Sequence, residues 1–129
     1  MTMAIIENYV CPKCFNQVQN CTCNFPPWTL IMIDVNIQEI IKVLNKKRYI
    51  TNGCCESHFD GNRNMYVSFI RKYDINCPDG FKMPSDRMSI NYTFKKNELK
   101  NKEKYEKIKS EKIKLLLEWA ESLPENSIK

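Results

Sequence analysis

Four cysteines within thirteen residues constrain this chain more than any other feature of its sequence. They are Cys11, Cys14, Cys21 and Cys23, in the pattern Cys-x2-Cys, six residues, then Cys-x-Cys. Cysteines paired on tight turns reach a single ion without long-range folding, and zinc prefers four tetrahedral ligands. The spacing therefore predicts one Zn²⁺ site at these residues, in preference to four unrelated buried thiols. An iron or iron–sulfur occupant has no specific cue in the sequence.

Four thiolates close the coordination sphere of zinc and leave no position for an activated water. The predicted site is therefore structural, and it stabilises a segment that is too short to fold alone. Pro12 and Lys13 lie between the first two cysteines, in the manner of a rubredoxin-type knuckle. The lysine also offsets part of the negative charge of the four thiolates.

The number of cysteines and the N-terminal residues together indicate a reducing compartment. The chain of 129 residues has 7 cysteines, an odd number that does not fit a complete disulfide framework. Residues 1–10 lack the basic start and apolar stretch of a signal peptide. The longest apolar run, residues 28–33, is far shorter than the ~20 residues that cross a bilayer. We therefore expect a cytoplasmic protein without a membrane partner.

The net charge of +5 attracts anions such as nucleotides, nucleic acids or acidic proteins, but it selects none of them. Much of the excess lies in residues 95–114, where lysines alternate with glutamates. A solvated helix face explains this alternation at least as well as a nucleic-acid-binding stripe does.

The rest of the chain predicts one small α+β domain. We expect a zinc-binding element over residues 1–24, a stiff Phe-Pro-Pro-Trp connector over 25–28, and a ligand-binding core over 29–129. The expected fold class is α+β: a small antiparallel sheet with two helices, the C-terminal one long, plus the N-terminal zinc knuckle or ribbon.

The first helix of the core is marked by apolar residues at helical spacing and by a capping signal. Asn36 followed by Glu39 fits a capping box, with Asp34 as a rival cap. Residues 46–48 (Lys-Lys-Arg) close the helix, where cations suit the carbonyl end of its dipole. The apolar stripe consists of Ile37, Ile40, Ile41 and Leu44.

Strand signals occur on both sides of this helix. Residues 30–33 fit either a buried strand or the lead into the helix, and residues 49–51 fit a short strand. A β-rich strand is expected over 65–70, after the turn-forming residues 60–62. Residues 89–95 alternate apolar and polar side chains, so one face of that strand is expected in the core.

The chain is expected to close with one long helix over residues 97–123. Ile108, Leu115, Leu116 and Trp119 lie close to one face of it. Because this apolar face is long for a domain of this size, we expect part of it to form a homodimer interface. Packing within a single chain is the alternative.

Residues 51–58 (Thr-Asn-Gly-Cys-Cys-Glu-Ser-His) form a second notable cluster, which includes the single histidine, His58. Backbone N–H groups and hydroxyls in a loop after a strand suit a phosphate or another polar ligand. Arg63 and Arg71 can add positive charge. We interpret this segment as part of a small-molecule pocket at a strand end. The alternative is a plain connecting loop with two buried cysteines.

Two sharper interpretations of this segment are less favoured. Cys55 and His58 can supply half of another metal site, but no second pair has convincing spacing, and Cys77 alone is a poor candidate. Cys55 and His58 can also be a nucleophile and its base, yet the sequence identifies no residue that orients the histidine.

The motif order CPKC…CTC, PPW, IDVNIQEIIKVLNKKRYITNGCCESH and a short strand resembles small uncharacterised proteins carried by phages and prophages of low-GC Gram-positive bacteria. The resemblance covers roughly residues 9–70. It implies a phage-borne accessory protein.

A more distant resemblance links residues 44–58 to the tRNA wybutosine-synthesis family, which binds S-adenosylmethionine and has a similar helix–strand–loop. It implies a loop that holds an adenosine-type ligand, without the family's modification chemistry. Thr51 and Cys55 match the family's loop, whereas Gly53, Cys54 and His58 depart from it.

These features together predict a non-enzymatic phage-type accessory protein that acts in counter-defence. It is expected to sequester a nucleotide-derived small molecule, such as a cyclic ADP-ribose-type immune signal. The side chains whose basic, polar or aromatic chemistry suits such a ligand are Asn52, Ser57, His58, Arg63, Arg71, Asn91, Tyr92 and Lys95.

The alternative function is a zinc-ribbon module that binds nucleic acid or inhibits a host defence protein, including a nucleic-acid-guided nuclease. Its support is the zinc element together with the net charge of +5. A methyltransferase-like enzyme is a third and disfavoured reading, because it rests on the distant resemblance alone.

Overall fold

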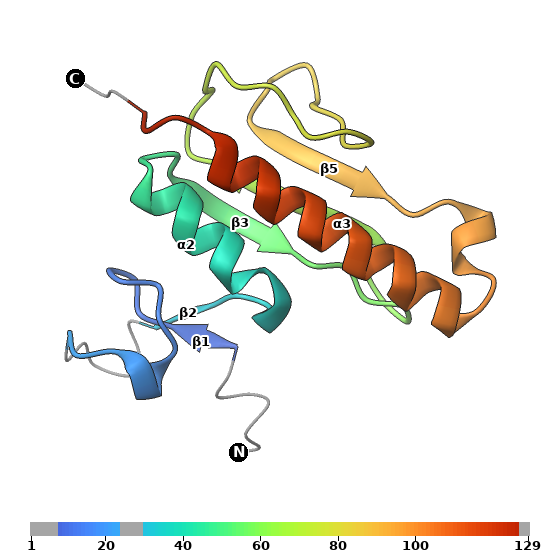
Figure 1. Ribbon diagram of the computed structural model, residues 1–129, viewed down its shortest axis with the longest axis horizontal. Coiled ribbons are helices and arrows are strands. Elements are labelled where there is room, and N and C mark those ends of the chain that lie inside the picture. The colour runs from blue at the N-terminus through green and yellow to red at the C-terminus, as the bar shows by residue number, and fades with distance from the viewer. Residues whose placement is uncertain (1–7, 24–29, 127–129) are drawn as a thin grey trace.

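The computed structural model describes residues 8–23 and 30–126. It shows an α+β fold with two antiparallel sheets and two α-helices, the C-terminal one long (Figure 1). The expected fold class is confirmed, and the expected connector over residues 25–28 lies outside the described residues. The elements, with η for a 3₁₀ turn, are β1 (Tyr9–Val10), η1 (Val18–Asn20), β2 (Ile31–Met32), η3 (Val35–Ile37), α2 (Gln38–Lys46), β3 (Thr51–Cys55), β4 (Asn64–Phe69), β5 (Ser89–Thr93), η4 (Lys96–Leu99) and α3 (Lys102–Ser122).

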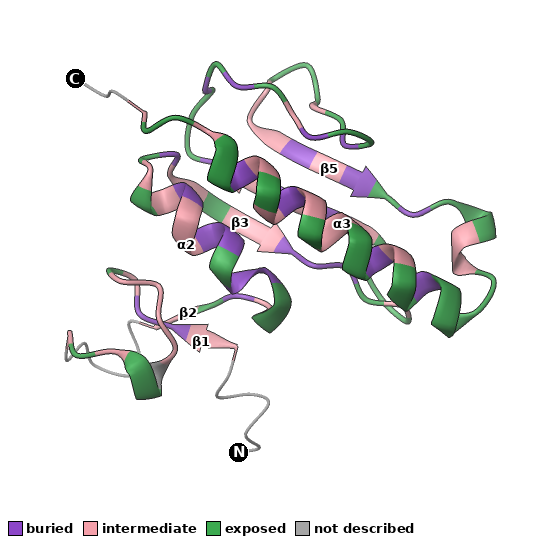
Figure 2. Cartoon of the chain, in the orientation of Figure 1, coloured by how far each residue is buried: buried purple, intermediate pink, exposed green. Residues whose placement is uncertain are grey.

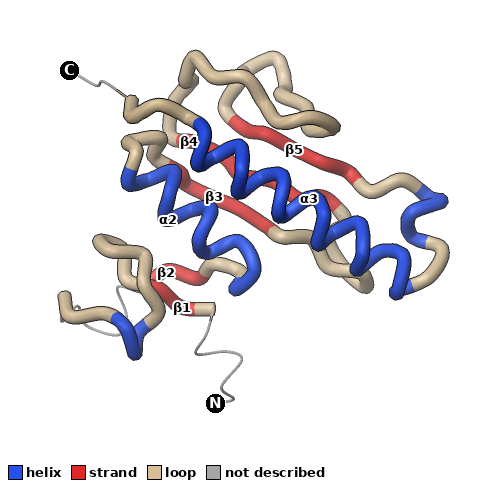
Figure 3. Tube along the Cα trace, viewed as in Figure 1, coloured by secondary structure: helices blue, strands red, loops and turns tan. Residues whose placement is uncertain are grey.

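Strands β3, β4 and β5 form a meander, and α2 and α3 lie side by side against one face of it (Figures 1 and 3). On the central strand β4, Met65, Val67 and Phe69 are buried and alternate with half-buried residues. On β5, Ile90 and Tyr92 are buried in the same core, so the alternation predicted for this strand is confirmed.

Strand β3 is longer than the sequence indicated. The segment 51–58 was expected to be a loop, but its first part, Thr51–Cys55, is a strand that pairs with β4. The register shifts between Thr51 and Gly53. A Cβ atom at Gly53 would lie 2.8 Å from Ser68 Oγ, so the missing side chain allows the two strands to meet. Pairing with β4 therefore overrides the loop-like composition of this segment.

The start of α2 also differs from the prediction. Asn36 lies inside η3 and not at a cap, so the predicted capping box with Glu39 is wrong. The backbone N–H and the side-chain amide of Asn36 donate to the carboxylate of Glu56, over 3.1 and 2.8 Å. Asp34, the rival cap, makes no capping hydrogen bond. The Glu56 carboxylate, which follows β3, therefore takes the place of the local helix cap that was expected here.

The remaining features of α2 follow the sequence more closely. All four residues of its predicted apolar stripe are buried. Lys46 and Lys47 lie at the C-terminal end of α2, as predicted, and Lys47 is its C-cap residue. The Nζ atom of Lys47 also donates to backbone carbonyls of Ala120, Glu121 and Leu123 at the C-terminus of α3. Such terminal carbonyls lack partners within the helix and favour a cation.

The closing helix is divided into η4 and α3, where one helix over 97–123 was expected. Asn101 caps α3, because its Oδ1 accepts the backbone N–H of Lys104 over 2.7 Å. The buried residues of α3 form a stripe toward the sheet, and exposed residues cover its outer side (Figure 2). In the described part of the chain, no helix combines the length and apolar character needed to cross a membrane.

The apolar face of α3 packs within the chain. Leu116 is buried, and Ile108, Leu115 and Trp119 are half-buried against the core. Among the described residues, the exposed large apolar side chains are Met32, Val35 and Ile70, which lie outside α3. The homodimer therefore stays a prediction.

The N-terminal element is joined to the core through a small sheet and through side-chain hydrogen bonds to α2. Val10 of β1 pairs with Ile31 of β2 and is fully buried. Gln17 Nε2 donates to Gln38 Oε1 at the start of α2 over 3.0 Å. The cysteine-bearing segment is therefore packed beside α2 (Figure 1).

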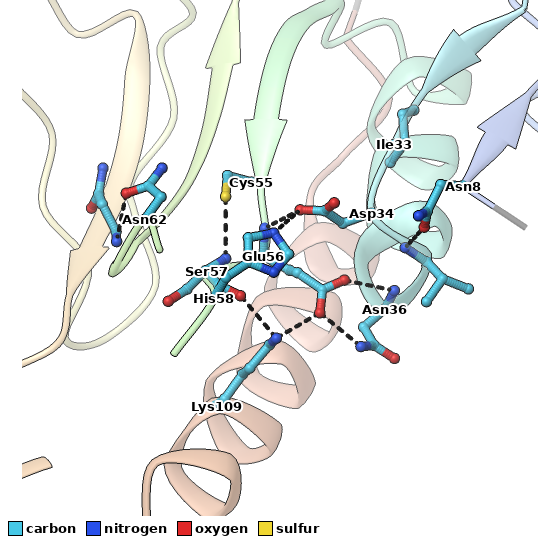
Figure 4. Close-up of polar contacts among 12 residues, drawn as sticks. Asn8, Ile33, Asp34, Asn36, Cys55, Glu56, Ser57, His58, Asn62 and Lys109 are labelled. Atoms are coloured by element: carbon cyan, nitrogen blue, oxygen red, sulfur yellow. Dashed lines mark hydrogen bonds and ion pairs between the residues drawn. The ribbon is translucent and has the colours of Figure 1, made fainter. Parts of the chain in front are cut away.

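A buried ion pair connects the end of β3 to α3 (Figure 4). Glu56 Oε2 and Lys109 Nζ are 2.6 Å apart, and the two side chains are only 7% and 10% exposed. Lys109 Nζ also donates to the carbonyl of Ser57 over 2.9 Å. Since the same carboxylate accepts two hydrogen bonds from Asn36, one ion pair fixes η3, α3 and the end of β3.

Replacing Lys109 by Met should destabilise the fold strongly. Removing one partner of a buried ion pair leaves an uncompensated buried charge, here Glu56, and costs about 3–5 kcal/mol. Urea unfolding measures the loss. Lys107→Met changes an exposed lysine of the same helix and should be close to neutral. Equal stability of the two variants would contradict the structural role of the pair.

Candidate functional site

The four clustered cysteines meet at one point in space. The Sγ atoms of Cys11, Cys14, Cys21 and Cys23 all lie within 4.8 Å of one another, so the group can hold a metal ion. Two turns bring them together, and Phe15 adopts a left-handed conformation (φ 60°) directly after the first pair. Cys11 is buried and the other three are half-buried.

Backbone N–H groups point at two of these sulfur atoms. The N–H groups of Lys13 and Cys14 donate to Cys11 Sγ over 3.3 and 3.5 Å, and that of Cys23 donates to Cys21 Sγ over 3.3 Å. Such bonds stabilise a thiolate more than a thiol, because the thiolate carries the charge. The turns are therefore built for sulfur in its metal-binding form.

Cys11 and Cys23 differ in how readily their thiols ionise. Burial opposes ionisation of Cys11, but the backbone hydrogen bonds from Cys14 and Lys13 lower its pKa to about 7. Burial and the neighbouring thiols raise the pKa of Cys23 to about 12. A cation among these sulfur atoms favours their ionised form, which fits the chemistry of a metal centre.

The predicted ligand contacts do not converge on one place. Ser57 is fully buried and shares a hydrogen bond of 2.8 Å with the hydroxyl of Tyr105. Asn52 Oδ1 accepts a hydrogen bond from Ser68 Oγ over 2.7 Å. Arg63 and Arg71 are exposed near the two ends of β4. The structure therefore places these side chains on different parts of the three-stranded sheet and its loops.

Three of the predicted contacts do come together. Asn91, Tyr92 and Lys95 line a hollow of about 480 Å³, which we call the lysine hollow. Two lysines that the sequence analysis did not single out complete its positive lining: Lys82, beside β5, and Lys112, on α3. Only the fold brings these three lysines together. The other lining residues are Gly80, Thr93 and Glu98.

Tyr92 and Glu98 organise the wall of the lysine hollow. Lys112 Nζ lies 4.6 Å from the centre of the Tyr92 ring, and the Tyr92 hydroxyl donates to the carboxylate of Glu98 over 2.7 Å. Burial and the adjacent Glu98 raise the pKa of Tyr92, so its hydroxyl stays a donor. Gly80 has φ 84°, and a Cβ there would lie 2.9 Å from Lys112 Nζ.

A larger hollow, of about 540 Å³, lies between the cysteine element and β3. Its lining is mainly apolar, with Phe15, Ile31 and Ile41 among the lining residues, and its one charged residue is Lys13. It is less suited to a phosphate group than the lysine hollow is, because an anion there would meet a single cation.

His58 has a partner that the sequence analysis missed. Its Nε2 lies 3.2 Å from Asp34 Oδ2, and the atoms of Asp34, Cys55 and His58 that can bind a metal lie within 4.8 Å of one another (Figure 4). Burial and the charge of Asp34 raise the pKa of the Cys55 thiol, which does not favour a thiolate nucleophile. In the sequence Asp34 carries only the signal of a helix cap, and no local pattern links it to His58.

No model of a known protein family matches the chain, and neither a curated protein nor a solved structure matches it significantly. The fold and the sites define an α+β protein with a four-cysteine element that can hold a metal ion.

Cys21→Ser should remove the ion of the four-cysteine centre. A hydroxyl does not replace a thiolate as a soft ligand, so elemental analysis of the freshly purified variant should show about one ion fewer per chain than the wild type. Cys77→Ser is the matched control, because Cys77 lies outside both clusters of metal-binding atoms in the described residues. Unchanged metal content in Cys21→Ser would contradict the assignment.

Proposed function

We propose that this protein binds a phosphate-bearing small molecule in the lysine hollow and acts by sequestering it, without catalysis. One observation carries the proposal: Lys82, Lys95 and Lys112 surround a hollow of about 480 Å³, with a single carboxylate, Glu98, in the lining. Hollows of this size suit small-molecule ligands.

The charge balance of the hollow supports an anion with more than one negative charge. Partial burial opposes ionisation of Glu98, but hydrogen bonds from the Lys95 N–H and the Tyr92 hydroxyl, with the charges of Lys95 and Lys112, lower its pKa. Glu98 is therefore ionised and offsets one lysine, which leaves a net positive lining. A pyrophosphate provides a matching charge and several strong acceptors.

Polar groups beside the lysines supply contacts for the rest of such a ligand. Asn91 and Thr93 belong to β5 and line the same hollow as Lys82. Their side chains already take part in a hydrogen-bonded group with Asn64, so they are held in place before a ligand arrives. Held donors and acceptors of this kind reduce the entropy lost on binding.

In its full form, the proposal is a phage-type counter-defence protein that sequesters a nucleotide-derived immune signal, such as a cyclic ADP-ribose-type molecule, in a host cytoplasm. The phage-related part rests on the sequence resemblance. The phosphate-binding part rests on the lysine hollow, and a sequestering protein needs affinity but no nucleophile or general base.

We also propose that the ion of the four-cysteine centre is zinc and that its role is structural. Four sulfur ligands on two tight turns match the composition of structural zinc sites, which have no free coordination position. Few apolar side chains of this segment are buried, and Val10 is its one described residue in the apolar core, so the ion would supply the cross-link that a core supplies elsewhere.

Lys112→Ala and Lys95→Ala should each weaken binding of the ligand. A lost charge-assisted hydrogen bond costs about 1.5–3 kcal/mol, or roughly ten- to a hundredfold in affinity. Isothermal titration calorimetry with cyclic ADP-ribose derivatives, ADP-ribose, cyclic nucleotides and S-adenosylmethionine identifies the ligand and measures the loss. Arg71→Ala is the matched control, because Arg71 is exposed and does not line the hollow.

Two outcomes of this experiment would contradict the proposal. Equal effects of Arg71→Ala and Lys112→Ala would mean that the lysine hollow is not the binding site. If no small molecule binds at micromolar concentration while short RNA or DNA binds with a steep salt dependence, the nucleic-acid-binding alternative replaces the proposal.

A further inference from the structure

We propose that Asp34, Cys55 and His58 bind a second metal ion, a divalent transition metal such as Zn²⁺, with one coordination position left for water. The three residues come from two segments that meet beside the start of η3 (Figure 4). Their carboxylate, sulfur and imidazole atoms lie within 4.8 Å of one another. None of the three lines the lysine hollow, so this inference does not depend on the proposed function.

The ligand types and their separation suit such an ion. Zinc binds thiolate at about 2.3 Å and imidazole or carboxylate at about 2.0–2.2 Å, so neighbouring ligand atoms on a tetrahedral ion lie about 3.3–3.6 Å apart. The Nε2 atom of His58 and the Oδ2 atom of Asp34 are 3.2 Å apart, close to that separation. These two atoms are therefore already spaced as ligands of one tetrahedral ion, and Cys55 Sγ lies within 4.8 Å of both.

Backbone groups hold two of the three ligands in position. The N–H of Glu56 donates to Asp34 Oδ2 over 3.0 Å, and the N–H of Ser57 donates to Cys55 Sγ over 3.3 Å. The second bond runs from residue i+2 to the sulfur of residue i. The N–H groups of Lys13 and Cys23 make the same bond to Cys11 and Cys21 in the four-cysteine centre.

The third ligand is held by the loop that follows β3. Ser57 has φ 78°, a left-handed conformation that turns the chain sharply between Cys55 and His58. The N–H of His58 then donates to the carbonyl of Asn62 over 2.6 Å. The buried ion pair lies directly behind this turn, because Lys109 donates to the Ser57 carbonyl. The site is therefore supported before any ion arrives.

The composition of this site differs from that of the four-cysteine centre. Within the described residues it offers three ligands, not four. The His58 side chain is 52% exposed, so water reaches the ion from that side. Three protein ligands with one exchangeable position are typical of zinc that binds or activates small molecules, whereas four thiolates are typical of structural zinc.

Equilibrium dialysis of the full chain against buffered Zn²⁺, followed by elemental analysis, tests the proposal. The wild type should bind a second ion beyond the one in the four-cysteine centre. His58→Ala should lose only the second ion, and Cys21→Ser only the first. Because His58 is exposed, its variant is expected to keep the fold, which circular dichroism verifies. Asp34→Asn should lower the affinity for the second ion by more than about tenfold.

Two control variants and one chemical probe make the result decisive. Cys54→Ser alters the neighbouring thiol, and Asp60→Asn alters an exposed carboxylate in the adjacent turn; both should keep the second ion. A wild type that binds a single ion, or a His58→Ala variant that binds as many ions as the wild type, would overturn the proposal. Iodoacetamide labelling of Cys55 that slows in His58→Ala but is unaffected by Zn²⁺ would also overturn it, in favour of a nucleophile–base pair.

Discussion

The buried ion pair between Glu56 and Lys109 is the contact on which the centre of this fold depends. Glu56 follows the edge strand β3, Lys109 lies in the middle of α3, and the Glu56 carboxylate also accepts hydrogen bonds from Asn36 in η3. Charges this deeply buried are tolerated only when they are paired and hydrogen-bonded. The pair therefore fixes the position of three elements that are far apart in the sequence.

The ion pair is also an example of a contact that the sequence could not predict, in contrast to patterns within a single element. Patterns that repeat along one element were sufficient: the cysteine spacing predicted a cluster that can hold a metal ion, and the alternation in residues 89–95 predicted the buried face of β5. Long-range polar contacts were not predictable. Glu56 replaces the expected cap at Asn36, and Lys47 closes α3, because their partners lie on other elements.

The same limit applies to the candidate sites. Asn91, Tyr92 and Lys95 were found by their chemistry, but Lys82 and Lys112 join them only after the fold places a loop and α3 beside β5. Residues 51–58, which were expected to form a phosphate-binding loop, differ from that expectation in their backbone structure. Pairing with β4 makes Thr51–Cys55 a strand. The hydroxyl of Ser57 is buried and shares a hydrogen bond with the hydroxyl of Tyr105.

Three regions of this small protein differ in chemistry: a four-cysteine cluster beside α2, a lysine hollow between β5 and α3, and the cluster of Asp34, Cys55 and His58 at the start of η3. We propose that the two clusters of metal-binding atoms each hold an ion and that they differ in how far water can reach that ion. Anomalous diffraction at the zinc absorption edge, from crystals grown with Zn²⁺, tests it most directly. We predict one peak among the four cysteine sulfur atoms and a second between Asp34, Cys55 and His58. A map with no peak at the second position would contradict the account.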